Sequence, residues 1–262
     1  MKKRLFTFCL PVLLALLIAF AGWSAAMTPA AELAGESLDY DIAFLWFDHL
    51  AEGRFSFAAA EEPGTYQAVL EARTLGVAGW LTGDRMQRYE SVMREGPEGV
   101  LRSLSYQASV VTGKGKQRKE KIKRYLFDYR TAEVKFSRLK DGKVTRAQTL
   151  PLNKAIPPKD ILTAFVNFRA GVLGPLAPNR RYVIPTFSHK GTSDIVIETL
   201  TEQERIGLPF PANGILARAK VDQEVFDTGG GSIYVWFDEL GRPARGTVEN
   251  VIGLGNVSGS LR

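Results

Sequence analysis

Cysteine and histidine are the side chains that this sequence of 262 residues nearly lacks. Its single cysteine is Cys9, and its two histidines are His49 and His189. Zinc sites and thiol nucleophiles are built from these side chains, so their scarcity argues against both kinds of site. A disulfide needs two cysteines and is excluded within one chain. We therefore expect no metal site and no cofactor, and we interpret both histidines as solvated residues at strand ends.

The motifs that carry familiar catalytic chemistry are also missing. The sequence contains no G-x-S-x-G, no H-E-x-x-H, no P-loop and no G-x-G-x-x-G after a predicted strand. We therefore predict no catalytic residues. A weaker alternative is a hydrolase built from the carboxylates of Asp39, Asp41, Glu71 and Asp84, although nothing sets these apart from ordinary surface acids.

Long apolar runs are confined to the N-terminus. Basic residues at 2–4 precede an apolar stretch over residues 5–22, and small residues follow up to Ala26. This order is typical of a secretory signal peptide that is cleaved near Ala26. We therefore predict that residues 1–26 are removed and that the protein is periplasmic or secreted. An uncleaved anchor is the alternative, because the stretch approaches the about 18 apolar residues that span a bilayer.

Cleavage would change both the cysteine content and the charge. Cys9 lies near the start of the apolar stretch, whereas a lipoprotein signal places its cysteine directly after it, so we predict that the protein is not a lipoprotein. An exported chain without disulfides fits a bacterial envelope. Removing the basic residues at 2–4 lowers the basic count from 34 to 31 against 28 acidic residues, so the net charge falls from +6 to +3. This weak charge gives no support for nucleic-acid binding.

Alternation of apolar and polar residues dominates the chain from residue 37 onward and predicts about a dozen short strands. Asp141-Gly142, between two alternating runs, is the strongest signal for a tight hairpin. Apolar residues at helical spacing after Pro157-Pro158 predict one principal helix at about 158–170.

The expected architecture is mainly β. We predict a strongly curved antiparallel sheet, or a partly open barrel or sandwich, with the one helix at 158–170. The boundaries are a disordered tether at 27–36 and a single domain at 37–262, with a division into two lobes near 150–158 as an alternative.

Aromatic residues on the predicted inner faces suggest a ligand site. We predict that they bind an apolar or amphipathic, lipid-like ligand, with the helix as a lid; the residues are Tyr40, Phe44, Trp46, Phe55, Phe57, Trp80 and Phe165. The alternative is that the same side chains simply pack the core.

One basic cluster stands out, and it surrounds a predicted hairpin tip. We predict that it contacts anionic lipid, polysaccharide or an envelope protein through Lys114, Lys116, Lys119, Lys121 and Lys123. The alternative is a solvated hairpin whose alternating lysines discourage pairing between sheet edges.

Three segments carry a resemblance to a known family. The run IYVWFDELGRPAR at 233–245 resembles the closing hairpin of the bacterial domain-of-unknown-function family 3108. Residues 38–42 resemble its opening strand, and residues 158–165 with Arg169 resemble its helix, so that the similarity spans about 37–261. The resemblance implies an exported envelope protein with a curved antiparallel sheet around a helix, loosely like lipoprotein carriers and other lipid-binding half-barrels. Such a likeness of fold does not assign a function.

The leading expectation is therefore a non-enzymatic envelope protein that binds an apolar or amphipathic ligand inside a curved β-sheet. The alternative is a structural or assembly factor that contacts envelope proteins or glycans through its surface.

Overall fold

The computed structural model describes residues 29–44, 47–76, 79, 83–188, 190–220, 231–251 and 255–262. The predicted signal peptide at 1–26 lies outside the described residues, as do Trp46, Trp80 and the side chain of Phe44. No helix in the described ranges combines the length and the apolar character needed to cross a membrane.

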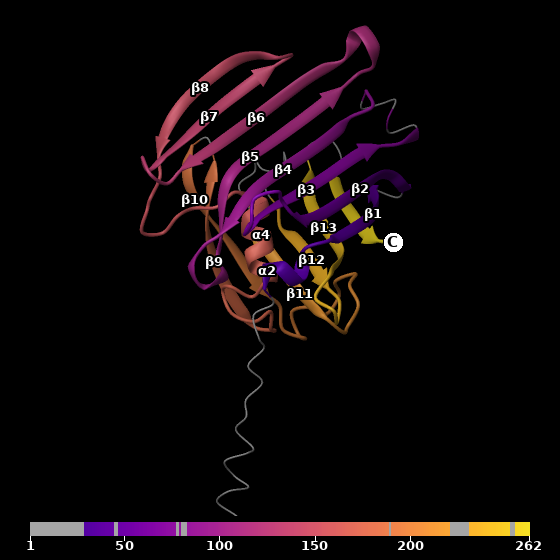
Figure 1. Ribbon diagram of the computed structural model, residues 1–262. Helices are drawn as coiled ribbons and strands as arrows, with labels where there is room; N and C mark the ends of the chain where they lie inside the picture. The colour runs from indigo at the N-terminus through magenta and orange to yellow at the C-terminus, as the bar shows by residue number, and fades with distance from the viewer. Residues whose placement is uncertain are drawn as a thin grey trace, which may run out of the picture.

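Fourteen strands within the described residues form one antiparallel sheet (Figure 1). The first meander consists of β1 (Glu36–Phe44), β2 (Phe47–Ala59), β3 (Thr65–Thr74), β4 (Met86–Glu95), β5 (Leu101–Thr112), β6 (Lys119–Asp128), β7 (Glu133–Lys140) and β8 (Lys143–Pro151). The second consists of β9 (Arg180–Ser188), β10 (Gly191–Thr199), β11 (Ile215–Lys220), β12 (Ile233–Phe237), β13 (Pro243–Val251) and β14 (Gly255–Leu261). The helices with described bounds include α2 (Ala30–Leu33) and α4 (Ile161–Arg169), and short 3-10 turns lie at Pro97–Gly99 and Gly115–Gln117.

The first and last strands of the chain join the two meanders in the middle of the sheet. β1 pairs with β14, with Tyr40 opposite Leu261, while β8 and β9 form the two outer edges. The sheet is therefore open, and the prediction of a mainly β chain with a curved antiparallel sheet and one principal helix is confirmed.

The predicted hairpin at Asp141-Gly142 connects β7 and β8. Both residues have positive φ, 47° and 76°, and Lys140 lies opposite Lys143, so the connection is a two-residue turn of the kind that matches strand twist.

Bulges and one glycine account for much of the curvature. A bulge bends a strand and increases its twist. Gly53 on β2 lies where a Cβ would come within 3.2 Å of Cδ1 of Ile42, so its missing side chain leaves room for the Ile42 side chain of the neighbouring strand β1. Register shifts of the bulge type occur at 42–44, 92–93, 138–139, 236–237 and 248–251.

The helix α4 begins and ends as its sequence predicts. Asp160 is the N-cap, and its side chain accepts hydrogen bonds from the backbone N–H groups of Leu162 and Thr163. At the other end Gly171 has φ 71°, and Val172 N donates to the carbonyl of Asn167, which closes the Schellman motif. The helix therefore spans 161–169, inside the predicted 158–170.

The helix lies inside the curve of the sheet, between the two meanders (Figure 1). Leu162 and Val166 pack into a core with the inner residues of β1–β5, whereas Ala164 and Phe168 pack into a second core with β9–β12. Because both sides of α4 are buried, the helix is an interior element. The expectation of a lid is therefore wrong.

The described part of the expected disordered tether at 27–36, residues 29–36, is ordered. Ala30–Leu33 form the short helix α2, and Ala30 is buried in the same core as Phe57. Gly35 N donates to the carbonyl of Phe57 at 2.8 Å, and β1 begins at Glu36. Burial of an apolar side chain and pairing with β2 hold this segment against the sheet.

A buried carboxylate ties α4 to the sheet. Asp160 is 1% exposed, and its Oδ2 accepts hydrogen bonds from Ser91 Oγ at 2.8 Å and Thr163 Oγ1 at 2.7 Å. Its backbone N–H donates to Ser103 Oγ at 2.9 Å. Burial raises the pKa of Asp160, and the hydrogen bonds that it accepts oppose this rise. The start of the helix is thereby fixed to β4 and β5.

Replacing Asp160 by alanine should destabilise the protein by about 2–5 kcal/mol, because the N-cap is lost and buried hydroxyls lose their acceptor. Asp160→Asn keeps one acceptor oxygen and should cost much less. Urea unfolding of the three proteins measures both effects.

The wild type and the Asp160→Asn variant also test how stability depends on pH. Because the folded-state pKa of Asp160 is raised, its carboxyl favours folding most below about pH 4 and loses that contribution as the pH rises through the raised pKa. The stability of the wild type relative to Asp160→Asn should therefore fall with rising pH. A difference that is flat or that increases with pH would contradict this assignment.

Candidate ligand-binding groove

A groove of about 600 Å³ opens on the inner side of the sheet, between β4–β7 and β9–β10. Its volume lies within the about 300–1,000 Å³ that is usual for small-molecule sites. Its apolar floor comes from both meanders and from the first residue of α4; the side chains are Tyr89, Tyr106, Tyr125, Ile161, Phe187 and Ile195.

The strand register determines which side chains reach the groove. Tyr106 on β5 lies opposite Tyr125 on β6, which lies opposite Phe136 on β7. Side chains alternate between the two faces of a strand, so Lys123 and Lys121 share the inner face with Tyr125. Lys119 lies on the same face, one step nearer the end of β6.

The neighbouring strand adds further cations to this inner face. Lys123 lies directly opposite Arg138, and Lys121 lies directly opposite Lys140. The inner face of β6 and β7 therefore changes along its length from aromatic residues in the depth of the groove to basic residues at its rim.

These rim cations lack ionic partners among the described residues. No ion pair between described residues includes any of these five side chains, which are Lys119, Lys121, Lys123, Arg138 and Lys140. Nε of Arg138 is buried without a hydrogen-bond partner. Like charges directly opposite one another on a sheet are destabilising, so this arrangement costs stability.

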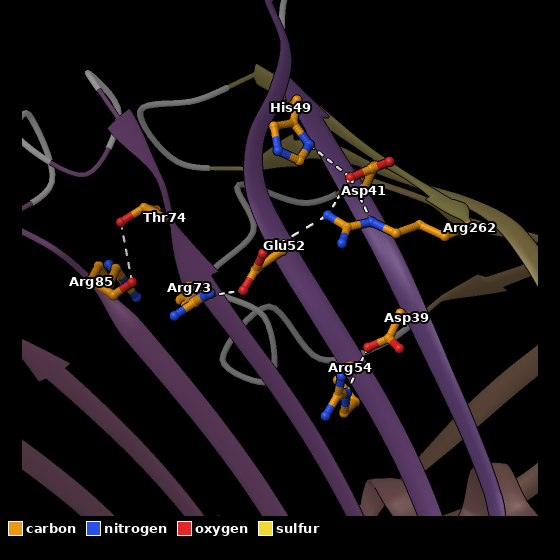
Figure 2. Close-up of polar contacts among 9 residues, drawn as sticks. All are labelled: Asp39, Asp41, His49, Glu52, Arg54, Arg73, Thr74, Arg85 and Arg262. Carbon is orange, nitrogen blue, oxygen red and sulfur yellow. Dashed lines mark hydrogen bonds and ion pairs between the residues drawn. The ribbon is translucent and has the colours of Figure 1, made fainter.

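The outer face of the sheet is arranged in the opposite way, as Figure 2 shows for β1–β3. Asp39 accepts a hydrogen bond from Arg54 Nε at 2.6 Å, and Glu52 pairs with Arg73.

Asp41 accepts a hydrogen bond from Arg262 Nε at 2.9 Å, and it contacts His49 Nδ1 at 2.7 Å. The hydrogen bond from Arg262 is the main cause that lowers the pKa of Asp41.

The four carboxylates of the hydrolase alternative belong to such pairs. Asp39 and Asp41 pair as above, Glu71 pairs with Arg88, and Asp84 lies 3.0 Å from Nζ of Lys114. None of the four lines the groove described here. Among the described residues, no three His, Cys, Asp or Glu side chains gather closely enough to hold a metal ion.

Four of the aromatic residues predicted to bind a ligand have described side chains, and these four pack in the core. Phe57 is 1% exposed and stacks on Tyr66, and Phe55 packs edge-on against Phe165 with ring centroids 5.4 Å apart. Tyr40 donates its hydroxyl hydrogen to the carbonyl of Pro243 at 2.9 Å. These four residues of the prediction fill the space around α4 and do not line the groove. The alternative of core packing holds for them.

The basic cluster divides into two parts. Lys114 and Lys116 are exposed at the hairpin tip between β5 and β6, as a surface contact requires. Lys119, Lys121 and Lys123 instead line the groove. Their alternation followed by Tyr125 was a visible signal in the sequence, because all four share one face of a strand. Arg138 and Lys140 were missed, since the sequence alone does not give their pairing with β6.

A second polar cluster holds the far end of α4. Arg169, whose side chain is 4% exposed, donates from Nη2 to Glu36 Oε1 at 2.9 Å and contacts the other carboxylate oxygen through Nη1. Nη2 also reaches the carbonyl of Gly241 at 3.4 Å. Burial is the main cause that raises the pKa of the neighbouring Tyr40. Arg169 therefore joins the end of α4 to β1 and to the turn before β13.

A family model described as "Protein of unknown function (DUF3108)" matches residues 39–256. The matched range contains the helix α4 and the hairpin of β12 and β13 that meet at Arg169. No curated protein matches the chain. No solved structure matches it either.

The buried ion pair makes a prediction about stability. Arg169→Leu should destabilise the protein by about 3–5 kcal/mol, because it leaves the carboxylate of Glu36 partly buried without its partner. Arg54→Leu, which breaks the exposed pair with Asp39, should leave the urea midpoint nearly unchanged. The double variant Glu36→Leu/Arg169→Leu should recover part of the loss. Equal losses for Arg169→Leu and Arg54→Leu would show that burial is not the cause.

Proposed function

The chain belongs to the DUF3108 family, and on that premise we propose that it is a non-enzymatic binding protein that holds the alkyl part of an amphipathic, lipid-like molecule in the groove. The observation that carries the proposal is the groove itself, an open concavity of about 600 Å³ with an aromatic and aliphatic floor.

The residues on the floor of the groove favour an apolar ligand. Tyr125, Phe187 and Ile195 form its buried part, and Tyr106 and Ile161, which are half-buried, line it as well. Each Å² of apolar surface that a ligand covers contributes about 25 cal/mol to binding, before the costs of association. Polar groups at the rim would keep the other end of the ligand in water, which favours an amphipathic molecule over a wholly apolar one.

The N-terminal sequence supports the cell envelope as the location of the proposed binding. A basic start, an apolar stretch and small residues up to Ala26 fit a secretory signal, so the proposed ligand is an envelope lipid or a molecule that resembles one. Release of the protein from spheroplasts together with periplasmic markers, and a mature N-terminus near residue 27, would support export.

Blocking the groove tests the proposal. Ala108 lies on the inner face of β5, between Tyr89 on β4 and Lys123 on β6. Ala108→Trp should fill the groove and lower the affinity for a fluorescent fatty-acid analogue by about tenfold or more, equivalent to about 1.4 kcal/mol of lost contact. Fluorescence titration of the full chain measures this.

Ser109→Trp is the matched control, because it adds the same side chain to the other face of the same strand. It should leave the affinity unchanged, and urea midpoints would verify that both variants are folded. Native mass spectrometry of the gently purified wild type should also detect a bound lipid. Absence of any bound lipid, with no binding of the analogue, would refute the proposed function and leave a surface-contact role as the remaining hypothesis.

A further inference from the structure

We propose that the groove is specific for an anionic headgroup, a carboxylate or a phosphate on an alkyl chain, which it binds between Lys123 and Arg138. This inference rests on the proposed function, because the same groove is taken to hold the alkyl chain.

The register brings the two cations together. Lys123 and Arg138 are directly opposite residues on β6 and β7, so their Cβ atoms are about 4.5–5.5 Å apart. Both side chains extend from the inner face, so one headgroup can contact an ammonium and a guanidinium at once. A guanidinium presents paired N–H donors that match the two oxygens of a carboxylate or phosphate.

The same register places the alkyl chain. Two residues along each strand, Tyr125 lies opposite Phe136, and that row begins the aromatic part of the inner face. Two residues of a strand span about 7 Å, so a headgroup at Lys123 and Arg138 leaves the first carbons of its chain above Tyr125. The geometry therefore fits one molecule with adjacent charged and apolar parts.

Charge complementarity selects the sign of the headgroup. Lys121 and Lys140 form the next pair outward, and Glu120, an acid that also contributes to the groove lining, lies 3.7 Å from Arg118. Cations that line a concave surface focus their field into it, which attracts anions and repels a cationic headgroup. A neutral headgroup would gain no affinity from this electrostatic attraction.

A series of compounds that share one alkyl chain tests the inference. The series comprises the carboxylate, the phosphate monoester, the alcohol and the trimethylammonium compound, each titrated as monomers into the full chain by calorimetry. The two anions should bind about tenfold or more tightly than the alcohol, the gain expected from a charge-assisted hydrogen bond, and the cation should bind most weakly. Added salt should weaken the binding of the anions and leave that of the alcohol unchanged.

Lys123→Gln and Arg138→Gln should each lower the affinity for both anions about tenfold while leaving the affinity for the alcohol unchanged. Arg124→Gln is the matched control, since Arg124 follows Lys123 on the outer face of β6 and its Nε donates to Gln107. The control removes the same charge and should leave all four affinities unchanged. Unchanged binding of the alcohol also shows that the variants are folded.

The outcomes separate the two proposals. Binding of the alcohol as tightly as the anions would overturn the anion preference and leave the proposed function standing. Failure of every alkyl compound to bind would overturn the proposed function. Binding of inorganic phosphate as tightly as the alkyl phosphate would overturn the inference, because the cations would then form an anion site that does not use the alkyl chain. Binding of anionic vesicles, with no binding of the monomeric alkyl anions, would also overturn it, because the cations would then contact a membrane surface.

Discussion

The architecture depends on one interaction, the fixing of α4 inside the curve of the sheet by a buried polar contact at each end. Among the described residues the two meanders share one strand pair, β1 with β14, so the helix supplies much of what holds their inner faces together. Asp160 binds its start to β4 and β5, and Arg169 binds its end to Glu36. Since buried polar groups are costly when a partner is missing, these contacts specify one position for the helix.

The position of the helix also determines where the groove lies. Leu162, Val166 and Phe168 are buried against the inner faces of β1–β5 and β9–β12. The inner face of β5–β7 extends beyond Ile161, the first helical residue, and stays open there. The groove therefore lies where the inner face of the sheet continues past the start of the helix.

The sequence predicted the fold better than it predicted the site. Period-2 alternation, the Asp141-Gly142 turn and the residues around Asp160 carry local signals, and the strands and the helix formed where those signals are strong. The site needs non-local information. Whether Phe55 lines a cavity or packs on Phe165 depends on where α4 docks, and whether Lys123 faces Arg138 depends on the pairing of β6 with β7. Alternation could assign Lys123 and Tyr125 to one face, but it does not reveal that this face is the concave one.

The two faces of the sheet differ in how their charged residues are paired. On the outer face, acids and bases lie opposite one another, as Asp39 does with Arg54 and Glu52 with Arg73. On the inner face of β6 and β7, bases lie opposite bases. The edge strand β8 carries basic residues as well, with Lys143 opposite Lys140 and Arg146 opposite Arg138. Lys121 and Lys123 lie on β6, a strand that is paired on both sides, where protection of a sheet edge is not needed. Like charges opposite one another on interior strands, next to an aromatic floor, cost stability, and the anion that we propose would offset that cost.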